Sequence, residues 1–151
     1  MDMHQFCDLL DPVLTVLSDL SLDDPKTAAD VLARELPVDG PAVMALRHAA
    51  EQGVADGWLV PKEMGGIKFG RAAKDRSGFS VDVVLSDGAG PAHRHPNGEV
   101  DLLFALEGEP AFDGNPPGWA VYEPGSEHVP GVSGGQMLII YFLPGGAIEW
   151  L

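Results

Sequence analysis

Apolar residues are spaced at helical intervals in the first third of the chain. In residues 4–20 they recur every three or four positions, which places them on one face of a helix. Two later segments each begin with a proline, Pro25 and Pro41, and proline is compatible with the first position of a helix. The pattern therefore predicts three helices, over residues 4–20, 25–36 and 41–55.

After Gly57 the pattern changes to short runs of β-branched and aromatic residues, which Gly, Pro, Asp and Ser separate. Closely spaced strands are typical of a sandwich or small barrel, so the predicted fold class is mainly β with a helical N-terminal segment. We expect residues 1–57 to form a helical extension that packs on a barrel of residues 58–151. The predicted strands are WLVP (58–61), GIKFGRAA (66–73), FSVDVVLS (79–86), EVDLLFALEG (99–108), GWAVYEPG (118–125), GQMLIIYFLP (135–144) and GAIEWL (146–151).

Length, charge and cysteine content narrow the class of protein. The 151 residues suit one domain, and 45% hydrophobic residues are enough for a core. A formal net charge of −14 argues against nucleic acid or an anionic membrane surface as a partner. Cys7 is the only cysteine, which leaves no intrachain disulfide and no cysteine-based zinc site. No apolar run reaches the roughly 18 residues of a membrane span, and we expect a cytoplasmic protein.

Histidines and acidic residues gather in the segment GAGPAHRHPNGEVDLLFALEG, residues 88–108. Side chains two residues apart on a strand point the same way, so His93 and His95 can converge on one point. Glu99 and Asp101 share a strand face for the same reason, and His128 follows in EPGSEHVP. Imidazole and carboxylate groups suit iron, manganese, nickel and zinc ions. The segment therefore predicts a metal site with positions open to a substrate.

Two motifs in this region resemble those of the cupin superfamily. The matching residues are Gly88, Gly90, His93, His95 and Glu99 in the first motif, and Gly118, Pro124, Gly125 and His128 in the second. The resemblance implies a double-stranded β-helix, also called a jelly-roll barrel, with a divalent Fe, Mn, Ni or Zn ion in its mouth. The implied metal ligands are His93, His95, Glu99 and His128. Cupins are commonly dimers, so the resemblance also implies a homodimer.

The first motif leaves the choice of carboxylate open. Gly108, which closes the motif, has the expected spacing from Asp101 and lies two residues late relative to Glu99. The distance from His95 favours Glu99 as the ligand. The other carboxylate would then lie beside the metal or act as a general acid or base, so Glu99 and Asp101 are both candidate catalytic residues.

Longer strings resemble the 4-hydroxylaminobenzoate lyase family of small bacterial cupin-like proteins. They are GWLVPKEMGGIKFGR, HPNGEVDLLFAL, FDGNPPGWAVYEPGSEHVP and VSGGQMLIIYFLPGGAIEW. The resemblance implies a carbon–nitrogen lyase that converts 4-hydroxylaminobenzoate to 3,4-dihydroxybenzoate and ammonia, in the degradation of aromatic compounds such as 4-nitrobenzoate. For this small aromatic substrate, Arg71 is the predicted partner of the carboxylate. The ring would pack on Phe104, Trp119, Tyr122 or Phe142, of which Phe104 and Tyr122 are the chosen candidates.

Two other functions use the same residues. A cupin dioxygenase would bind oxygen at the open positions of an iron ion and act on a small aromatic. A cupin that binds a small ligand without catalysis would serve as a sensor or a store. Oxygen consumption during turnover distinguishes the first alternative, and open coordination positions on a bound metal argue against the second.

Overall fold

Three helices form the first third of the chain in a computed structural model that describes all residues, 1–151. They are α1 (Met3–Ser18), α2 (Pro25–Glu35) and α3 (Pro41–Asp56). Asp2 and Asp24 cap the first two helices by accepting hydrogen bonds from backbone N–H groups that the first turn leaves unpaired. The three predicted helices are confirmed. None of them is long and apolar enough to cross a membrane.

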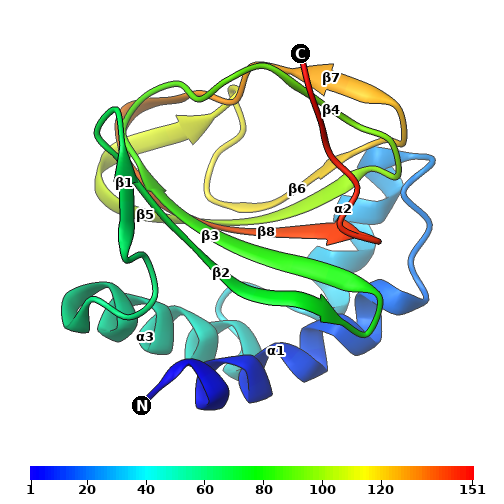
Figure 1. The fold of residues 1–151 in the computed structure, drawn as a ribbon. Helices are drawn as coiled ribbons and strands as arrows, with labels where there is room; N and C mark the ends of the chain where they lie inside the picture. The colour runs from blue at the N-terminus through cyan, green and yellow to red at the C-terminus, as the bar shows by residue number, and fades with distance from the viewer.

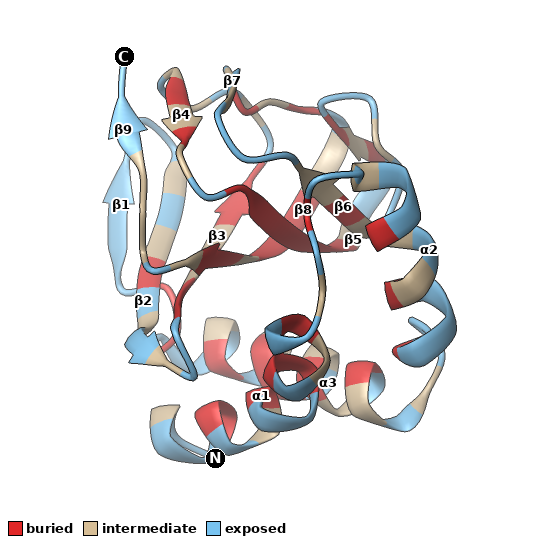
Figure 2. Cartoon of the chain, turned by 90° about the vertical axis from the view of Figure 1, so that its right-hand side faces the viewer, coloured by how far each residue is buried: buried red, intermediate tan, exposed pale blue.

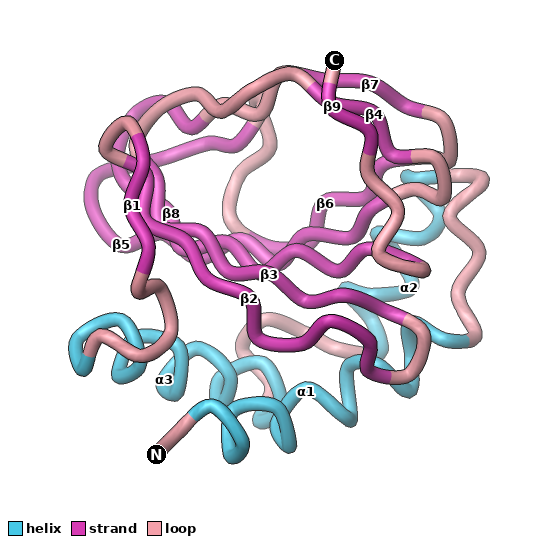
Figure 3. Tube along the Cα trace, in the orientation of Figure 1, coloured by secondary structure: helices cyan, strands magenta, loops and turns pink.

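Nine strands follow the helices, and every pairing between them is antiparallel. They are β1 (Lys62–Met64), β2 (Ile67–Arg76), β3 (Phe79–Ser86), β4 (His93–His95), β5 (Glu99–Phe112), β6 (Gly118–Tyr122), β7 (Ser126–His128), β8 (Val132–Pro144) and β9 (Glu149–Trp150). A six-stranded sheet has the order β1-β2-β3-β8-β5-β6, and a three-stranded sheet has the order β7-β4-β9. The small sheet lies across one face of the curved large sheet, and the helices lie along the other face (Figures 1 and 3).

Two predicted strands differ from the structure. WLVP is not a strand, because the N–H of Leu59 donates to the Gly53 carbonyl near the end of α3 and Pro61 has no N–H to give to a sheet. The first strand, β1, begins just after this segment. GAIEWL forms a strand only at its end, in β9, because Gly145 and Gly146 first turn the chain with positive φ angles.

Two apolar layers cover opposite faces of the large sheet. The larger layer is a cluster of 26 buried residues that joins the helices to the sheet, and it includes Leu102 and Phe142. Figure 2 shows buried residues both along the strands and on the helix faces turned toward them. The smaller layer lies inside the barrel and consists of Leu103, Phe112, Ala120, Val132, Met137 and Ile139. Successive residues of β5 therefore face the helices and the barrel interior in turn.

The mainly β architecture with a helical N-terminal segment is confirmed. Trp119 of β6 donates from its indole nitrogen to the Leu36 carbonyl at 2.9 Å, and Arg47 of α3 donates to the Ala105 carbonyl of β5 at 2.8 Å. These bonds and the large cluster connect both sides of the boundary expected at Gly57, and that boundary stays a prediction. The small sheet, with β4 and β7, therefore faces the barrel side of the large sheet, away from the helices (Figure 1).

Candidate metal centre

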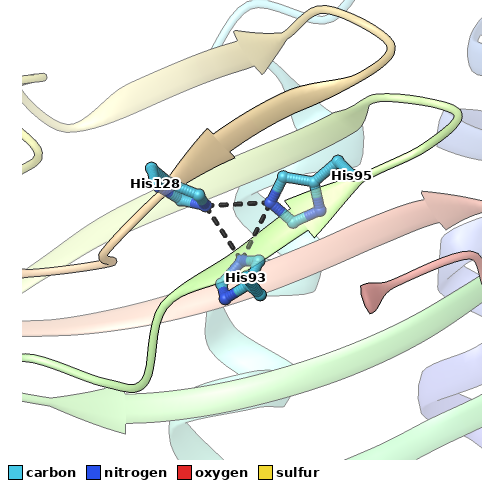
Figure 4. A group of neighbouring side chains, drawn as sticks. All are labelled: His93, His95 and His128. Atoms are coloured by element: carbon cyan, nitrogen blue, oxygen red, sulfur yellow. Dashed lines mark hydrogen bonds between the residues drawn. The ribbon is translucent and has the colours of Figure 1, made fainter. Parts of the chain in front are cut away.

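Two neighbouring strands bring the three histidines together. His93 and His95 are the ends of β4, and Arg94 between them points outward, where it bonds to Glu127 and Glu149. β4 pairs with β7 in a register that sets His93 opposite His128. Residues directly opposite each other in a sheet share a face, so the three imidazoles converge, as Figure 4 shows.

The three Nε2 atoms meet at distances that suit a single ion. Nε2 of His93 lies 2.9 Å from that of His95 and 2.9 Å from that of His128, and the last two are 2.8 Å apart. Imidazole binds zinc at about 2.0–2.1 Å, and neighbouring corners of an octahedron of that radius are about 2.9 Å apart. In a tetrahedron of the same radius the corners are about 3.4 Å apart. The spacing therefore fits three ligands on one face of an octahedron.

Hydrogen bonds on the far side of two imidazoles fix which nitrogen carries the proton. Nδ1 of His93 lies 3.0 Å from the Pro91 carbonyl oxygen, and Nδ1 of His128 lies 2.6 Å from Oδ2 of Asp113. Both oxygens only accept, so both Nδ1 atoms donate, and in a neutral ring Nε2 is left with a lone pair. Lone pairs of neighbouring rings thus face one another across less than 3 Å. A cation between them would turn this repulsion into coordination.

His93 and His95 are in the protonation state that a metal requires. Burial, and then the neighbouring His93 and His128, lowers the pKa of His95 to about 3. Burial also lowers the pKa of His93. Both rings are therefore neutral at pH 7, and neutral imidazole is the form that binds metal ions.

A tight turn carries the chain from His95 to Glu99. The N–H of Gly98 donates to the His95 carbonyl at 3.1 Å, and Gly98 has a φ of +85°. A Cβ at this position would lie 2.8 Å from the Tyr122 carbonyl oxygen, so glycine is required. Oε2 of Glu99 lies 3.3 Å from Nε2 of His95 and 3.8 Å from Nε2 of His128. This buried oxygen has no hydrogen-bond partner, so it fits a further ligand position on the same ion.

Asp101 follows on the same face of β5. It is 0% exposed, and neither of its carboxyl oxygens has a hydrogen-bond partner. Burial raises the pKa of Glu99 to about 8, and burial together with the charge of Glu99 raises the pKa of Asp101 well above its usual range. Two neighbouring buried carboxyl groups are costly to ionise together. The donor set of three imidazoles and a carboxylate therefore fits a divalent cation, which would offset that cost.

Tyr122 is brought to the histidines. Its ring centroid lies 4.4 Å from that of His128, and its hydroxyl donates to Oδ2 of Asp113 at 2.6 Å. Because the hydroxyl is engaged in this bond, the part of Tyr122 that is free to contact a substrate is its ring.

Arg71 lies on the same face of the large sheet as the carboxylates, but farther along it. Arg71 is opposite Asp82, Asp82 is opposite Tyr141, and Tyr141 is opposite Asp101. Arg71 donates to the carboxylate of Asp82 at 2.9 Å and 3.4 Å, and its side chain is half exposed. The guanidinium is thus at the solvent-exposed end of a polar row that leads to Asp101.

Phe104 is not brought to the histidines. It is opposite Leu138 and belongs to the cluster between the sheet and the helices, where the Arg47 guanidinium carbon lies 5.5 Å from its ring centroid. Phe104 and Asp101 are three positions apart on β5, and side chains at an odd separation point to opposite faces. Phe104 therefore does not line the space beside the histidines.

Three residues that contact the histidines or lie next to Asp101 were not predicted from the sequence. Asp113 binds His128 and Tyr122, Tyr141 lies between Asp82 and Asp101, and the Trp150 ring centroid is 5.5 Å from that of His93. The dipeptide Asp113-Gly114 is a hairpin-turn signal that marks the place of one of them. The positions of the other two depend on strand register, which has no local signal in the sequence.

Three histidines converge inside the barrel, with the buried carboxyl groups of Glu99 and Asp101 on β5. Among solved structures, an RmlC-like cupin protein from Ralstonia eutropha JMP134 is similar, with a TM-score of 0.46 and 13% identity over 62% of this chain and 66% of that one. Residues 8–150 match the family described as PnbB, 4-hydroxylaminobenzoate lyase. The chain belongs to this family and is a lyase-like enzyme.

Two relatives carry the name 4-hydroxylaminobenzoate lyase. The protein from Nocardioides sp. (strain LMS-CY) is 29% identical over 95% of this chain and 93% of its own length. The protein from Pseudomonas putida is 30% identical over 65% of this chain and 68% of its own length. The predicted family and enzyme class are confirmed.

Proposed function

We propose that this enzyme converts 4-hydroxylaminobenzoate, or a related hydroxylamino-aromatic acid, to 3,4-dihydroxybenzoate with release of ammonia. The observation that supports this most is the convergence of three imidazoles and Glu99, with the buried carboxyl group of Asp101 on the same strand face, in a chain of the lyase family. Such a set combines a place for a metal ion with a group that can hold a proton.

His93, His95, His128 and Glu99 are the proposed metal ligands. The distance of Glu99 from the nitrogens supports it as the carboxylate ligand over Asp101, whose oxygens have no contact with the histidines. The octahedral spacing favours iron, manganese or nickel over a tetrahedral zinc site. When bound, such an ion would supply Lewis-acid polarisation of a substrate oxygen or activation of water.

The reaction balances with water alone. The N–O bond breaks with its electron pair on oxygen, which leaves as water after it takes up a proton, and the ring becomes electron-poor. One water adds at the carbon next to the nitrogen-bearing carbon, and a second replaces the nitrogen, which leaves as ammonia. The net change consumes one water and needs no external oxidant, because nitrogen is reduced as the ring is oxidised.

Asp101 is the proposed proton donor to the departing hydroxyl oxygen and the acceptor of the proton from the attacking water. Its burial keeps the neutral acid available, since burial and the charge of Glu99 raise its pKa. A carboxyl group that alternates between the two states can serve both steps. Tyr141, opposite Asp101 on β8, lies between this carboxyl group and the solvent-exposed end of the polar row.

Arg71 is the proposed partner of the substrate carboxylate, and the ring of Tyr122 is the proposed packing surface for the substrate ring. Arg71 shares the sheet face of Asp101, and guanidinium binds carboxylate with two parallel hydrogen bonds. In the structure Asp82 occupies those donors. A substrate carboxylate would therefore compete with Asp82 for Arg71.

The test is an anaerobic assay of the purified, metal-replete enzyme with 4-hydroxylaminobenzoate. Ammonia and 3,4-dihydroxybenzoate are expected in equal amounts, and oxygen from labelled water is expected in the product. Replacement of His95 by Ala, with the same protein concentration, is the matched control. If the metal-replete enzyme releases neither product, this substrate is refuted. If turnover occurs only with oxygen, the enzyme is a dioxygenase instead.

A further inference from the structure

We propose that Asp113 is a positioning residue, which fixes the tautomer and the orientation of His128 so that Nε2 faces the metal site. The expected effect of Asp113 on metal affinity rests on the proposed metal centre. The role of Asp113 itself rests on the contacts that its carboxylate makes. No motif in the sequence points to this residue as part of the site.

The position of Asp113 comes from a two-residue hairpin turn after β5. Phe112 and Asn115 exchange N–H to carbonyl hydrogen bonds, each 2.8 Å long. The two residues between them, Asp113 and Gly114, both have positive φ angles, +51° and +82°. This is the pattern of a type I′ turn, for which Asp-Gly is a favoured sequence. The turn directs the carboxylate back toward β7.

The carboxylate accepts hydrogen bonds from three donors. Oδ2 accepts from Nδ1 of His128 at 2.6 Å and from the Tyr122 hydroxyl at 2.6 Å, and Oδ1 accepts from the N–H of Gly131 at 2.9 Å. The N–H of Asp113 also donates to the Gly131 carbonyl at 2.9 Å. The turn is therefore tied on both sides to the segment that carries His128.

Only a carboxylate satisfies all three partners. An ionised Asp side chain has acceptors on both oxygens, whereas Asn has one acceptor oxygen and a donor NH₂ group. With Asn at position 113, the NH₂ group would face either the Gly131 N–H or the hydroxyl and imidazole donors. The second arrangement forces His128 to present a lone pair at Nδ1 and its proton at Nε2, where the metal binds.

The consequence for the metal centre follows from ligand orientation. Metal-binding histidines commonly donate their second ring nitrogen to a carboxylate or carbonyl, and loss of that partner costs about 10–100-fold in metal affinity. His93 has such a partner in the Pro91 carbonyl, which no side-chain substitution removes. His128 depends on Asp113, so this is the ligand whose orientation a single substitution can change.

Two measurements on the full chain test the proposal. The first is nitrogen-15 NMR of the imidazoles in metal-free wild-type protein, which reports the protonated nitrogen directly. His128 is expected with its proton on Nδ1, and a proton on Nε2 overturns the proposal. This measurement requires neither bound metal nor catalytic activity.

The second measurement compares metal affinity, by competition with a chromophoric chelator and Mn²⁺, between wild type and Asp113→Asn. The substitution is expected to weaken Mn²⁺ binding about 10–100-fold. Asp87→Asn, at an exposed loop residue without side-chain hydrogen bonds, is the matched control and should bind Mn²⁺ as the wild type does. Equal affinity in Asp113→Asn and wild type overturns the proposal.

The outcomes separate this inference from the proposed function. A wild-type protein that binds no divalent metal refutes the proposed metal centre, but the NMR result still decides whether Asp113 sets the His128 tautomer. A wild-type protein that binds metal and lacks lyase activity refutes the proposed reaction and leaves the affinity test valid.

Discussion

Replacement of Leu46 by Ala should strongly destabilise the fold while leaving the metal site intact. Leu46 lies on α3, is 0% exposed, and belongs to the cluster that joins the helices to the outer face of the large sheet. Phe104, on the outer face of β5, belongs to the same cluster, and Asp101 lies on the inner face of that strand. β5 therefore connects the helical layer to the site. The substitution therefore tests whether the helices belong to the same folding unit as the barrel.

The size of the effect follows from the deleted atoms. Leu→Ala removes three buried carbons, and each is worth about 0.8 kcal/mol of transfer free energy, or about 2.4 kcal/mol in all. The cavity that remains adds to this, and such substitutions at fully buried sites cost about 3–5 kcal/mol. We expect a decrease of about 3–4 kcal/mol in the free energy of unfolding.

The assay is urea denaturation, monitored by tryptophan fluorescence and by far-ultraviolet circular dichroism. Trp58 and Trp119 pack against the same cluster, so fluorescence reports on this layer. The two signals should coincide in one transition, and metal affinity should be unchanged. Met44→Ala, on the exposed side of the same helix, is the control and should change stability by less than about 1 kcal/mol. A Leu46→Ala variant as stable as this control, or two separate transitions, would refute the reasoning.

The remaining predictions concern the site. Glu99→Gln should release the metal, as measured by elemental analysis, whereas Asp101→Asn should retain it and lose turnover; the assignment of roles fails if both variants keep metal and full activity. Arg71→Ala should raise KM about 10–100-fold, because hydrogen bonds to charged groups contribute about 1.5–3 kcal/mol, and an unchanged KM would exclude Arg71 from substrate binding. Chelation of the metal should lower the unfolding temperature and abolish activity, and both should return when the ion is restored.

The alternation of side chains along a strand predicted much of the site, and the same alternation argues against the assignment of Phe104 to it. The two-residue spacing placed His93 with His95 and Glu99 with Asp101. The structure brings both histidines and Glu99 together, and Asp101 is buried on the same strand face as Glu99. The same rule places Phe104 on the other face of β5, because it lies at an odd separation from Asp101. Both faces of this strand are buried, so hydrophobicity alone does not identify the interior face.

Contacts that depend on register or on a turn were harder to predict. The polar row from Asp101 to Arg71 exists because four strands pair in one register, and strand pairing over long separations has no local sequence signal. Asp113 could be recognised as a turn residue, but the direction of its carboxylate depends on where the turn meets β7. WLVP has strand-like composition, yet its backbone bonds to the end of α3. The expected homodimer and cytoplasmic location stay predictions.

Elemental analysis of the purified protein tests the central claim, that three histidines and Glu99 hold a divalent metal ion, most directly. The wild type should retain close to one ion of iron, manganese or nickel per chain, and His95→Ala should retain almost none while remaining folded by circular dichroism. The three Nε2 atoms lie 2.8–2.9 Å apart, and on two of the rings Nδ1 donates a hydrogen bond away from the site; these two observations are the basis of this expectation. A wild-type protein that holds no divalent metal after reconstitution, or a His95→Ala variant that holds as much as the wild type, would contradict it.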